Sequence, residues 1–285
     1  MNDLLSLIKN LREITGAGFV DCKKALIENN NDIDNSIDYL RKKGLSKASK
    51  KSNREAKEGA VGFYSKDNRS IIIKINSETD FAAKSEKFLN FVDMIGNIAL
   101  NVDANLNINT FLDYEHEEKK ISDLFKETIS VIGENIILGD LMIINHENFH
   151  VNYYVHNPYK SNLGKIISVV VYKTLDNNNE IKQFSRNLCM HIAASKPEAM
   201  DIELLNPDTV KKEKDFQTES IKSSGKPENV INKILEGKMK KFFEESTLLN
   251  QKYVLDPDKT VKNVIEELPK ECNFELTDYK LLLLN

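Results

Sequence analysis

The spacing of the apolar residues changes near Gly59, and this change most constrains the fold of the chain. Over the first 44 residues, apolar side chains recur every three or four positions, in runs interrupted at 15–18 and 29–32. The pattern predicts a minimal bundle of three helices, at 4–14, 19–28 and 33–44. From Gly59 the apolar residues alternate and β-branched runs begin, which is typical of strands. A helical domain therefore precedes a region that contains strands.

A basic segment lies between these two regions. Residues 41–57 contain eight Lys and Arg against one acid, and almost no large apolar side chain. Such a run is typical of a linker or of a solvated basic helix, and we assign 45–58 as a linker. Its charge could hold RNA phosphates, but no aromatic residues that could stack on bases are interleaved with it. We therefore do not expect RNA contact.

The region after the linker reads as two successive α+β subdomains. Residues 59–64 and 70–76 flank a polar turn and predict a β-hairpin. Helical spacing and then fresh strand patterns follow, with turn chemistry at Asn157-Pro158. The helices expected here are 88–102, 121–132 and 181–195, and the strands are 136–145, 149–156 and 165–172. Helices followed by a new run of strands indicate tandem α+β subdomains.

The last third of the chain predicts a helical hairpin. Residues 206–223 and 227–245 are polar with heptad-like apolar positions, and Ser223–Pro227 joins them as a tight turn. We expect an antiparallel coiled-coil hairpin at about 200–248, a short helix at 260–268, and a C-terminal strand at about 273–284. The predicted domains are a three-helix domain at 1–44, the linker at 45–58, an N-terminal core subdomain at 59–139 and a C-terminal core subdomain at 140–285.

Charge and composition exclude several classes of protein. The formal net charge is only −4, with 40 Lys and Arg against 44 Asp and Glu, which is too balanced for a protein that coats nucleic acid. Apolar stretches are a few residues long, far below the ~20 that cross a bilayer. Three distant cysteines form no Cys-x-x-Cys pair, and the N-terminal segment carries an early acid, unlike a secretory or transit segment. We expect a cytoplasmic protein without membrane contact.

One motif suggests a metal. His146-Glu147-Asn148-Phe149-His150, with His156 six residues later, has the histidine spacing of a zinc metallopeptidase. That chemistry requires the first two histidines one turn apart on a helix, whereas the flanking residues are strand-like. In a strand, positions four apart lie ~13 Å apart, too far for two zinc bonds. We expect a turn at Glu147-Asn148 and no metal, and keep the peptidase as an alternative function, beside an RNA-binding accessory of translation.

Two further places could carry a function. Glu78-Thr79-Asp80-Phe81 stands where a strand gives way to a helix, so that Phe81 could project from a polar tip instead of entering the core. Thr15-Gly16-Ala17-Gly18 bends the chain between two helices and leaves Phe19 and Val20 beside the bend, as a possible docking corner. No phosphate-binding loop or nucleophile elbow is present, so we expect no cofactor, no direct nucleotide binding and no catalytic residue.

These places lie in motifs that resemble those of the elongation factor Ts family, the guanine-nucleotide exchange factors of elongation factor Tu. The motifs follow the family's order along nearly the whole chain. They are Leu11-Arg12 with Thr15–Gly18 and Asp21–Leu26, Glu78–Phe81, Ile132–Asn135, Met190–Pro197, and Ser224–Pro227 with Glu236–Phe242. This sequence departs from the family's usual residues at Phe19-Val20, Ser77, Ala82 and Leu138-Gly139, and lacks its Gly-Glu-Gly ending.

The resemblance implies an α+β fold with a ubiquitin-associated-like bundle, two core subdomains and the inserted hairpin. It implies a partner, elongation factor Tu, in its GDP-bound and nucleotide-free states, and exchange without enzymatic catalysis. Asp80 and Phe81 would form the exchange wedge beside the partner's magnesium and phosphate site. The other residues that the resemblance assigns to partner binding are Arg12, Phe19, Val20, Ile132, Gly133, His156, Val254 and Leu255.

Overall fold

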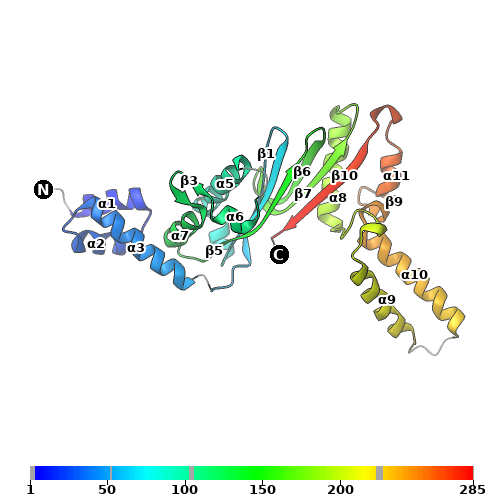
Figure 1. Ribbon diagram of the computed structural model, residues 1–285, viewed down its shortest axis with the longest axis horizontal. Coiled ribbons are helices and arrows are strands. Elements are labelled where there is room, and N and C mark those ends of the chain that lie inside the picture. The colour runs from blue at the N-terminus through cyan, green and yellow to red at the C-terminus, as the bar shows by residue number, and fades with distance from the viewer. Residues whose placement is uncertain (1–3, 52, 103–105, 223–226, 285) are drawn as a thin grey trace. The chain divides into compact units, whose positions relative to one another are not determined.

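The computed structural model describes residues 4–51, 53–102, 106–222 and 227–284 (Figure 1). The chain divides into two compact units. Unit 1 holds residues 1–145, 157–165 and 282–285, and unit 2 holds 146–156 and 166–281. The sequence-based division at 44, 58 and 139 stays a prediction. Among the described residues, no helix combines the length and the apolar character needed to cross a membrane.

The N-terminal bundle has the three helices that the sequence predicts. They are α1 (Leu4–Thr15), α2 (Phe19–Glu28) and α3 (Ile33–Lys51). One apolar face of each turns inward, and the buried residues are Ile8, Leu11, Cys22, Ala25, Leu26 and Leu40. Gly16, at a φ of +66°, takes the left-handed conformation that the bend after α1 requires.

Helix α3 is longer than the sequence indicated. We expected it to end near Gly44, but it continues to Lys51, through the first half of the predicted linker. Gly44 is buried against Ser130 of α7, where a Cβ would collide with the Ser130 side chain. The glycine therefore lets two helix backbones approach closely and does not end the helix.

The core of unit 1 is a sheet covered by helices. Strand β1 (Glu58–Lys66) pairs antiparallel with β2 (Arg69–Ser77), and β2 pairs antiparallel with β5 (Ile136–Asn145). Helices α5 (Glu86–Asn101) and α7 (Ile121–Ile132) bury their apolar faces in the same cluster as these strands, around Phe88 and Ile73. The six-stranded sheet also includes β6 (His150–Lys160), β7 (Leu163–Lys173) and β10 (Glu275–Leu283). Its order is β10-β7-β1-β2-β5, with β6 paired to β7. The predicted hairpin and both helices are confirmed.

Shorter elements of unit 1 had no signal in the sequence pattern. They are α4 (Asp80–Ala83), α6 (Ile108–Leu112), and the small hairpin of β3 (Glu115–His116) and β4 (Lys119–Lys120). The pairing of β2 with β5 shifts register between Lys74 and Ile75, where Gly139 is the extra residue of β5. Gly139 faces Asn76 there at a distance that leaves no room for a Cβ.

Unit 2 is built around the packing of α8 (Asn179–Ser195) on strand residues. Its buried cluster includes Tyr172, Leu188 and Ile192, with Tyr253 and Val261 from the C-terminal segment. Strands β6 (His150–Lys160) and β7 (Leu163–Lys173) pair with each other. The turn predicted at Asn157-Pro158 is wrong, because β6 continues through both residues and the turn lies at Ser161-Asn162.

The rest of unit 2 contains the predicted pair of polar helices. Helices α9 (Pro207–Lys222) and α10 (Glu228–Ser246) lie side by side and run in opposite directions (Figure 1). Lys238 Nζ donates to Gln217 Oε1 across the pair at 2.7 Å. The predicted joining turn at 223–226 lies outside the described residues. The remaining elements are η1 (Ile202–Leu204), η2 (Leu248–Asn250), β8 (Lys252–Tyr253), β9 (Asp256–Thr260), α11 (Val261–Glu266), η3 (Lys270–Cys272) and β10 (Glu275–Leu283).

Candidate partner-binding surfaces

Phe81 lies on the surface, which is one of the two placements that the sequence left open. It is the second residue of α4, which begins directly after β2, and 85% of the residue is exposed. Its neighbours Ala82 and Ala83 are buried and anchor the short helix to the core. The ring therefore does not pack in the core of its own chain. This placement is compatible with contact to another molecule.

The structure joins the segment 78–81 to the segment 132–135, and we call these eight residues the tip. Glu134 accepts two hydrogen bonds from Thr79, from its backbone N–H at 2.9 Å and from its hydroxyl at 2.7 Å. Glu78 Oε1 in turn accepts from the backbone N–H of Asn135 at 2.6 Å. Two motifs that are far apart in the sequence thus form one site. Sequence reasoning missed Glu78 and Glu134 as contributors to its geometry.

Asp80, the other predicted wedge residue, already has a charged neighbour. Lys84 Nζ lies 2.8 Å from Asp80 Oδ2, one helical turn away. The hydrogen bond from Lys84 lowers the pKa of Asp80, and the same contact raises the pKa of Lys84. Both side chains are well exposed, so the pair contributes little to stability. Asp80 therefore presents an ionised carboxylate at the surface.

Ile132 and Gly133 lie at the end of α7. Gly133 has a φ of +89°, the left-handed conformation that ends many helices, and its N–H donates to Ile129 at 2.9 Å. The Gly133 carbonyl accepts a hydrogen bond from the Lys51 ammonium at the end of α3. Ile132 is half-buried and Gly133 is exposed. Both residues therefore belong to the surface of the tip.

Arg12, Phe19 and Val20, the bundle surface, flank the bend between α1 and α2. Arg12 is exposed, as are 43% of Phe19 and 77% of Val20. Burial raises the pKa of the Cys22 thiol, while Thr15 and the charge of Arg12 oppose the shift. The charge of Arg12 therefore acts on Cys22, in the first turn of α2. The bend brings a cation and two apolar side chains to one corner of the bundle.

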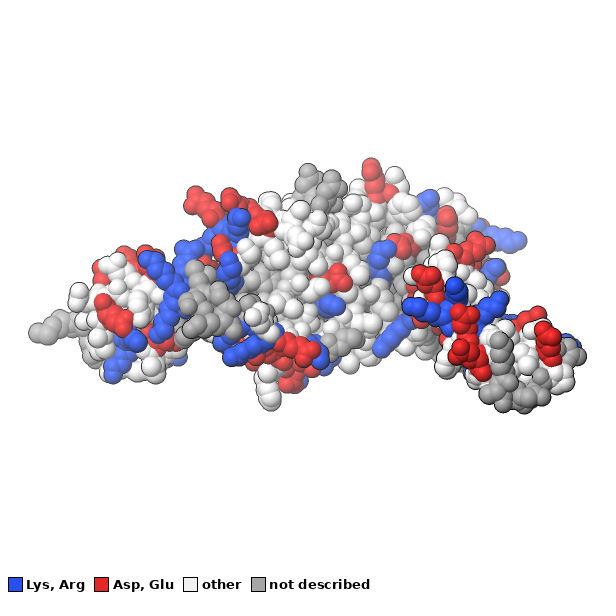
Figure 2. Space-filling model, turned by 60° about the horizontal axis from the view of Figure 1, so that its bottom comes forward, with Lys and Arg blue, Asp and Glu red and all other residues white. Residues whose placement is uncertain are grey.

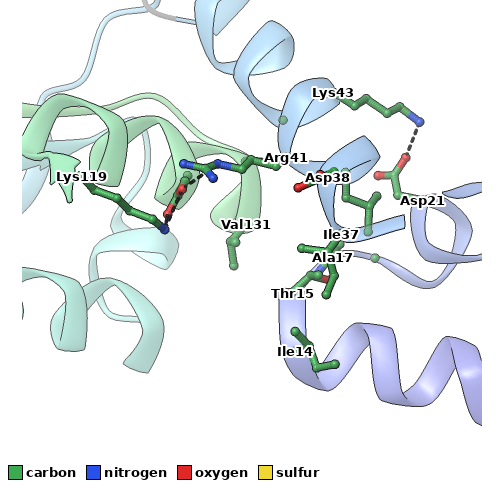
Figure 3. A pocket seen from close by; sticks show the side chains of 15 residues that line it. Ile14, Thr15, Ala17, Asp21, Ile37, Asp38, Arg41, Lys43, Lys119 and Val131 are labelled. Carbon is green, nitrogen blue, oxygen red and sulfur yellow. Dashed lines mark hydrogen bonds and ion pairs between the residues drawn. The ribbon is translucent and has the colours of Figure 1, made fainter. Parts of the chain in front are cut away.

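A hollow lies between α2, α3 and α7, and Figure 3 shows the side chains that line it. Five of its six charged residues pair with one another. Lys43 lies 3.0 Å from Asp21, and Arg41 and Lys119 lie 3.3 and 3.0 Å from carboxylate oxygens of Glu127. These pairs connect α3 with α2 and α7. The hollow thus has the features of packing between helices.

The basic run is also largely neutralised where its side chains are described. Arg41 and Lys43 pair as above, Arg54 lies 3.5 Å from Glu78, and Lys57 lies 2.7 Å from Glu55. On the face drawn in Figure 2, basic and acidic groups lie beside one another. A continuous basic groove for nucleic acid would require unpaired cations along one face. This part of the structure does not favour RNA binding.

His156, Val254 and Leu255, the unit 2 surface, lie on two elements. His156 is half-buried on β6, with its Nδ1 3.4 Å from the hydroxyl of Tyr154. Val254 and Leu255 form the turn between β8 and β9 and are 48% and 54% exposed. The turn presents two apolar side chains to solvent, which is typical of a contact surface.

A buried histidine holds this turn. The Val254 N–H donates to His191 Nδ1 at 3.2 Å, so the other ring nitrogen of His191 carries the proton that it shares with Gln251 Oε1 at 3.0 Å. Gln251 Nε2 donates to the carbonyl oxygens of Glu245 and Ser195. Burial lowers the pKa of His191, and the bond to Gln251 opposes the shift. The network requires a neutral imidazole, and sequence reasoning missed it.

The network predicts a pH dependence of stability. The unfolded chain takes up a proton on His191 near its usual pKa of 6.5, whereas the folded chain does so only at lower pH. The free energy of unfolding should therefore fall as the pH drops below about 6.5. In His191→Asn, whose amide oxygen can still accept from Val254, this contribution disappears. Urea unfolding at pH 7, 6 and 5 should show a smaller loss of unfolding free energy in the variant than in the wild type. Equal losses in the two proteins would contradict the assignment of this pH dependence to His191.

The histidines that suggested zinc lie as the strand pattern predicted. The residues His146 to Phe149 form a turn, with Phe149 N–H donating to the His146 carbonyl at 3.0 Å and Asn148 at a φ of +65°. His150 begins β6, and its Nδ1 lies 3.0 Å from Asn177 Nδ2. In the described ranges, no three His, Cys, Asp or Glu side chains gather so that they could hold a metal ion. The helical arrangement of a zinc peptidase is therefore not formed.

Comparison with known proteins gives one consistent result. Residues 78–281 match the family described as Elongation factor TS. The protein named Elongation factor Ts from Allorhizobium ampelinum is 40% identical over 281 residues, which cover 98% of this chain and 91% of that protein. Those from Sinorhizobium fredii and Bartonella tribocorum are each 40% identical, over 93% and 92% of this chain and 86% of their own lengths. The similarity includes both segments of the tip.

Proposed function

Because the chain belongs to the elongation factor Ts family, the nucleotide exchange factors of elongation factor Tu, we propose that it exchanges nucleotide through the tip and two docking surfaces. The family membership makes it an exchange factor and not a catalytic enzyme. The observation that carries the proposed mechanism is the exposure of Phe81 on an anchored turn. The hydrogen bonds that Thr79 makes to Glu134 and Ala82 at the start of α4 support a rigid projection.

Exchange of this kind requires a difference in affinity for two states of the partner, and it requires no catalytic residue. A protein that binds the nucleotide-free partner more tightly than the GDP-bound partner lowers GDP affinity by the same factor. A difference of about 4 kcal/mol corresponds to roughly a thousandfold change in affinity. By the same reciprocity, rebinding of nucleotide expels the factor. This chain therefore needs surfaces that fit the partner when its nucleotide site is opened.

Phe81 and Asp80 supply the two chemistries that such opening requires. Phe81 offers an exposed ring that can enter an apolar gap and displace what fills it. Asp80 offers an ionised carboxylate that can repel phosphate oxygens or compete for groups that hold magnesium. We assign Phe81 as the wedge and Asp80 as its charged neighbour, with Ile132 and Gly133 beside them on the tip.

The other two surfaces increase affinity. The bundle surface combines the cation of Arg12 with the apolar side chains of Phe19 and Val20, a composition common in contact hot spots. The unit 2 surface adds Val254 and Leu255, with His156 as a polar contact. Residues 1–44 then act as a docking domain, and the core subdomains carry the wedge and the second contact. The chain itself binds neither GDP nor RNA in this mechanism.

The proposal is tested by the release of fluorescent GDP from elongation factor Tu. We expect release to accelerate with the concentration of this protein and to reach a plateau, because exchange proceeds through a ternary complex. Asp80→Ala and Phe81→Ala should each slow GDP release. The double variant should slow release by less than the product of the two single factors, because neighbours on one surface are coupled. Strictly independent effects would contradict a shared site.

A further inference from the structure

Helix α4 is too short to fix its own direction. It has four residues, whereas a helix gains stability of its own only over several turns. Its first turn depends on Thr79, whose side-chain oxygen accepts the N–H of Ala82 at 3.2 Å. The direction of Phe81 therefore depends on how Thr79 is held. An 85% exposed ring gains little orientation from contacts within its own chain.

Glu134 holds Thr79 at both of its donors. The carboxylate accepts the Thr79 backbone N–H through one oxygen and the Thr79 hydroxyl proton through the other, at 2.9 and 2.7 Å. Because the hydroxyl proton points to Glu134, a lone pair of the same oxygen is left for the N–H of Ala82. One carboxylate thus sets both the backbone and the cap at the start of α4. Hydrogen bonds to an ionised group are stronger than neutral ones.

The segment that carries Glu134 is itself held from the other side. Glu78 Oε1 accepts the N–H of Asn135, and the Asn135 side-chain amide donates to the Arg54 carbonyl at 2.7 Å. Asn135 is only 1% exposed, so Glu134 extends from a buried anchor. Each glutamate therefore accepts a backbone N–H from the other segment. This reciprocal arrangement leaves Thr79 with few alternative positions.

We propose that Glu134 is a positioning residue for exchange, which aims Phe81 by fixing Thr79. The inference rests on the proposed role of Phe81 as the wedge. A ring that is already aimed loses less conformational entropy when it enters the partner, so more of its contact energy is available to open the nucleotide site. Glu134 touches neither nucleotide nor magnesium in this mechanism and acts through Phe81 alone.

The test measures GDP release from elongation factor Tu at saturating concentrations of the exchange factor. We expect Glu134→Ala to slow the maximal release about tenfold, the scale of coupling between contacting residues. Glu134→Gln should release GDP near the wild-type rate, because its amide can accept the Thr79 N–H and donate to the Thr79 oxygen. Glu55→Ala is the matched control, since it removes a carboxylate that pairs with Lys57 at the surface. It should have no effect.

A double variant separates positioning from a general loss of structure. If Glu134 acts through Phe81, Glu134→Ala should cause no further loss in a Phe81→Ala protein. A full additional loss there, or a wild-type rate in the single variant, would overturn the proposal. Thr79→Val removes the hydroxyl that donates to Glu134 and caps Ala82, and it should also slow maximal release about tenfold. This second variant keeps the proposal testable if Glu134→Ala folds poorly. A wild-type rate for Phe81→Ala alone would instead show that the wedge assignment is wrong.

Discussion

Phe81→Ala should slow GDP release from elongation factor Tu by roughly 30-fold, the effect of losing a contact worth about 2 kcal/mol at a binding hot spot. Its thermal stability should stay within about 0.5 kcal/mol of the wild type, as is usual for exposed positions. The reason is the exposure of the ring, 85% of which faces solvent in the free protein. Stopped-flow release of fluorescent GDP and thermal unfolding measure the two quantities.

Phe88→Ala is the matched comparison, because Phe88 is a phenylalanine of the same unit that is fully buried in the core. Its truncation should cost roughly 3–5 kcal/mol of stability by leaving a cavity. If Phe81→Ala instead loses stability on that scale, the ring packs within its own chain and is no wedge. A stable and fully active Phe81→Ala protein would remove Phe81 from the mechanism.

Removal of residues 1–51 should weaken binding to elongation factor Tu by about a hundredfold, since it removes the whole bundle surface and its cluster of hot-spot residue types. The boundary follows the end of α3 at Lys51, because a cut at 44 would divide this helix. The remaining core keeps its own apolar cluster and should stay folded. Calorimetric titration of each protein with GDP-bound elongation factor Tu measures the loss of affinity.

Phe19→Ser with Val20→Ser is the control for this truncation. The double substitution keeps the buried face of the bundle, because both side chains are largely exposed. The double variant should reproduce most of the loss of affinity for elongation factor Tu if binding depends on these two side chains. Unchanged affinity in both proteins would show that the bundle surface does not dock, whereas a loss in the truncated protein alone would assign the contact to another part of the bundle.

Elements with strong periodicity were predictable from the sequence. Helices α5 and α7 and the β1–β2 hairpin bury one face each, and that burial leaves its spacing in the sequence. Gly44 was misread because a glycine usually marks a helix end, and its close approach to Ser130 depends on a residue far away in the chain. At Asn157-Pro158, local turn preference was likewise overridden by pairing in the sheet.

The candidate site was predictable only in part. The place of Phe81 between a strand and a helix allowed either an exposed or a buried ring, and the motifs named its neighbours. The bonds that hold it, from Glu134 to Thr79 and from Glu78 to Asn135, join residues 55 and 57 positions apart. The network of His191 and Gln251 spans 60 positions. No periodicity or spacing rule reports such contacts, because they depend on how separate elements meet after folding.

The reciprocal bonds of the tip also bear on how this protein is made. A ribosome delivers the chain from its N-terminus, so Thr79 and Phe81 leave the exit tunnel well before Glu134 exists. Until β5 has been synthesised and has paired with β2, nothing supplies the carboxylate that fixes Thr79. A partly made chain therefore displays the phenylalanine without its orientation. The orientation of Phe81 is therefore set only after β5 has been synthesised and has paired with β2.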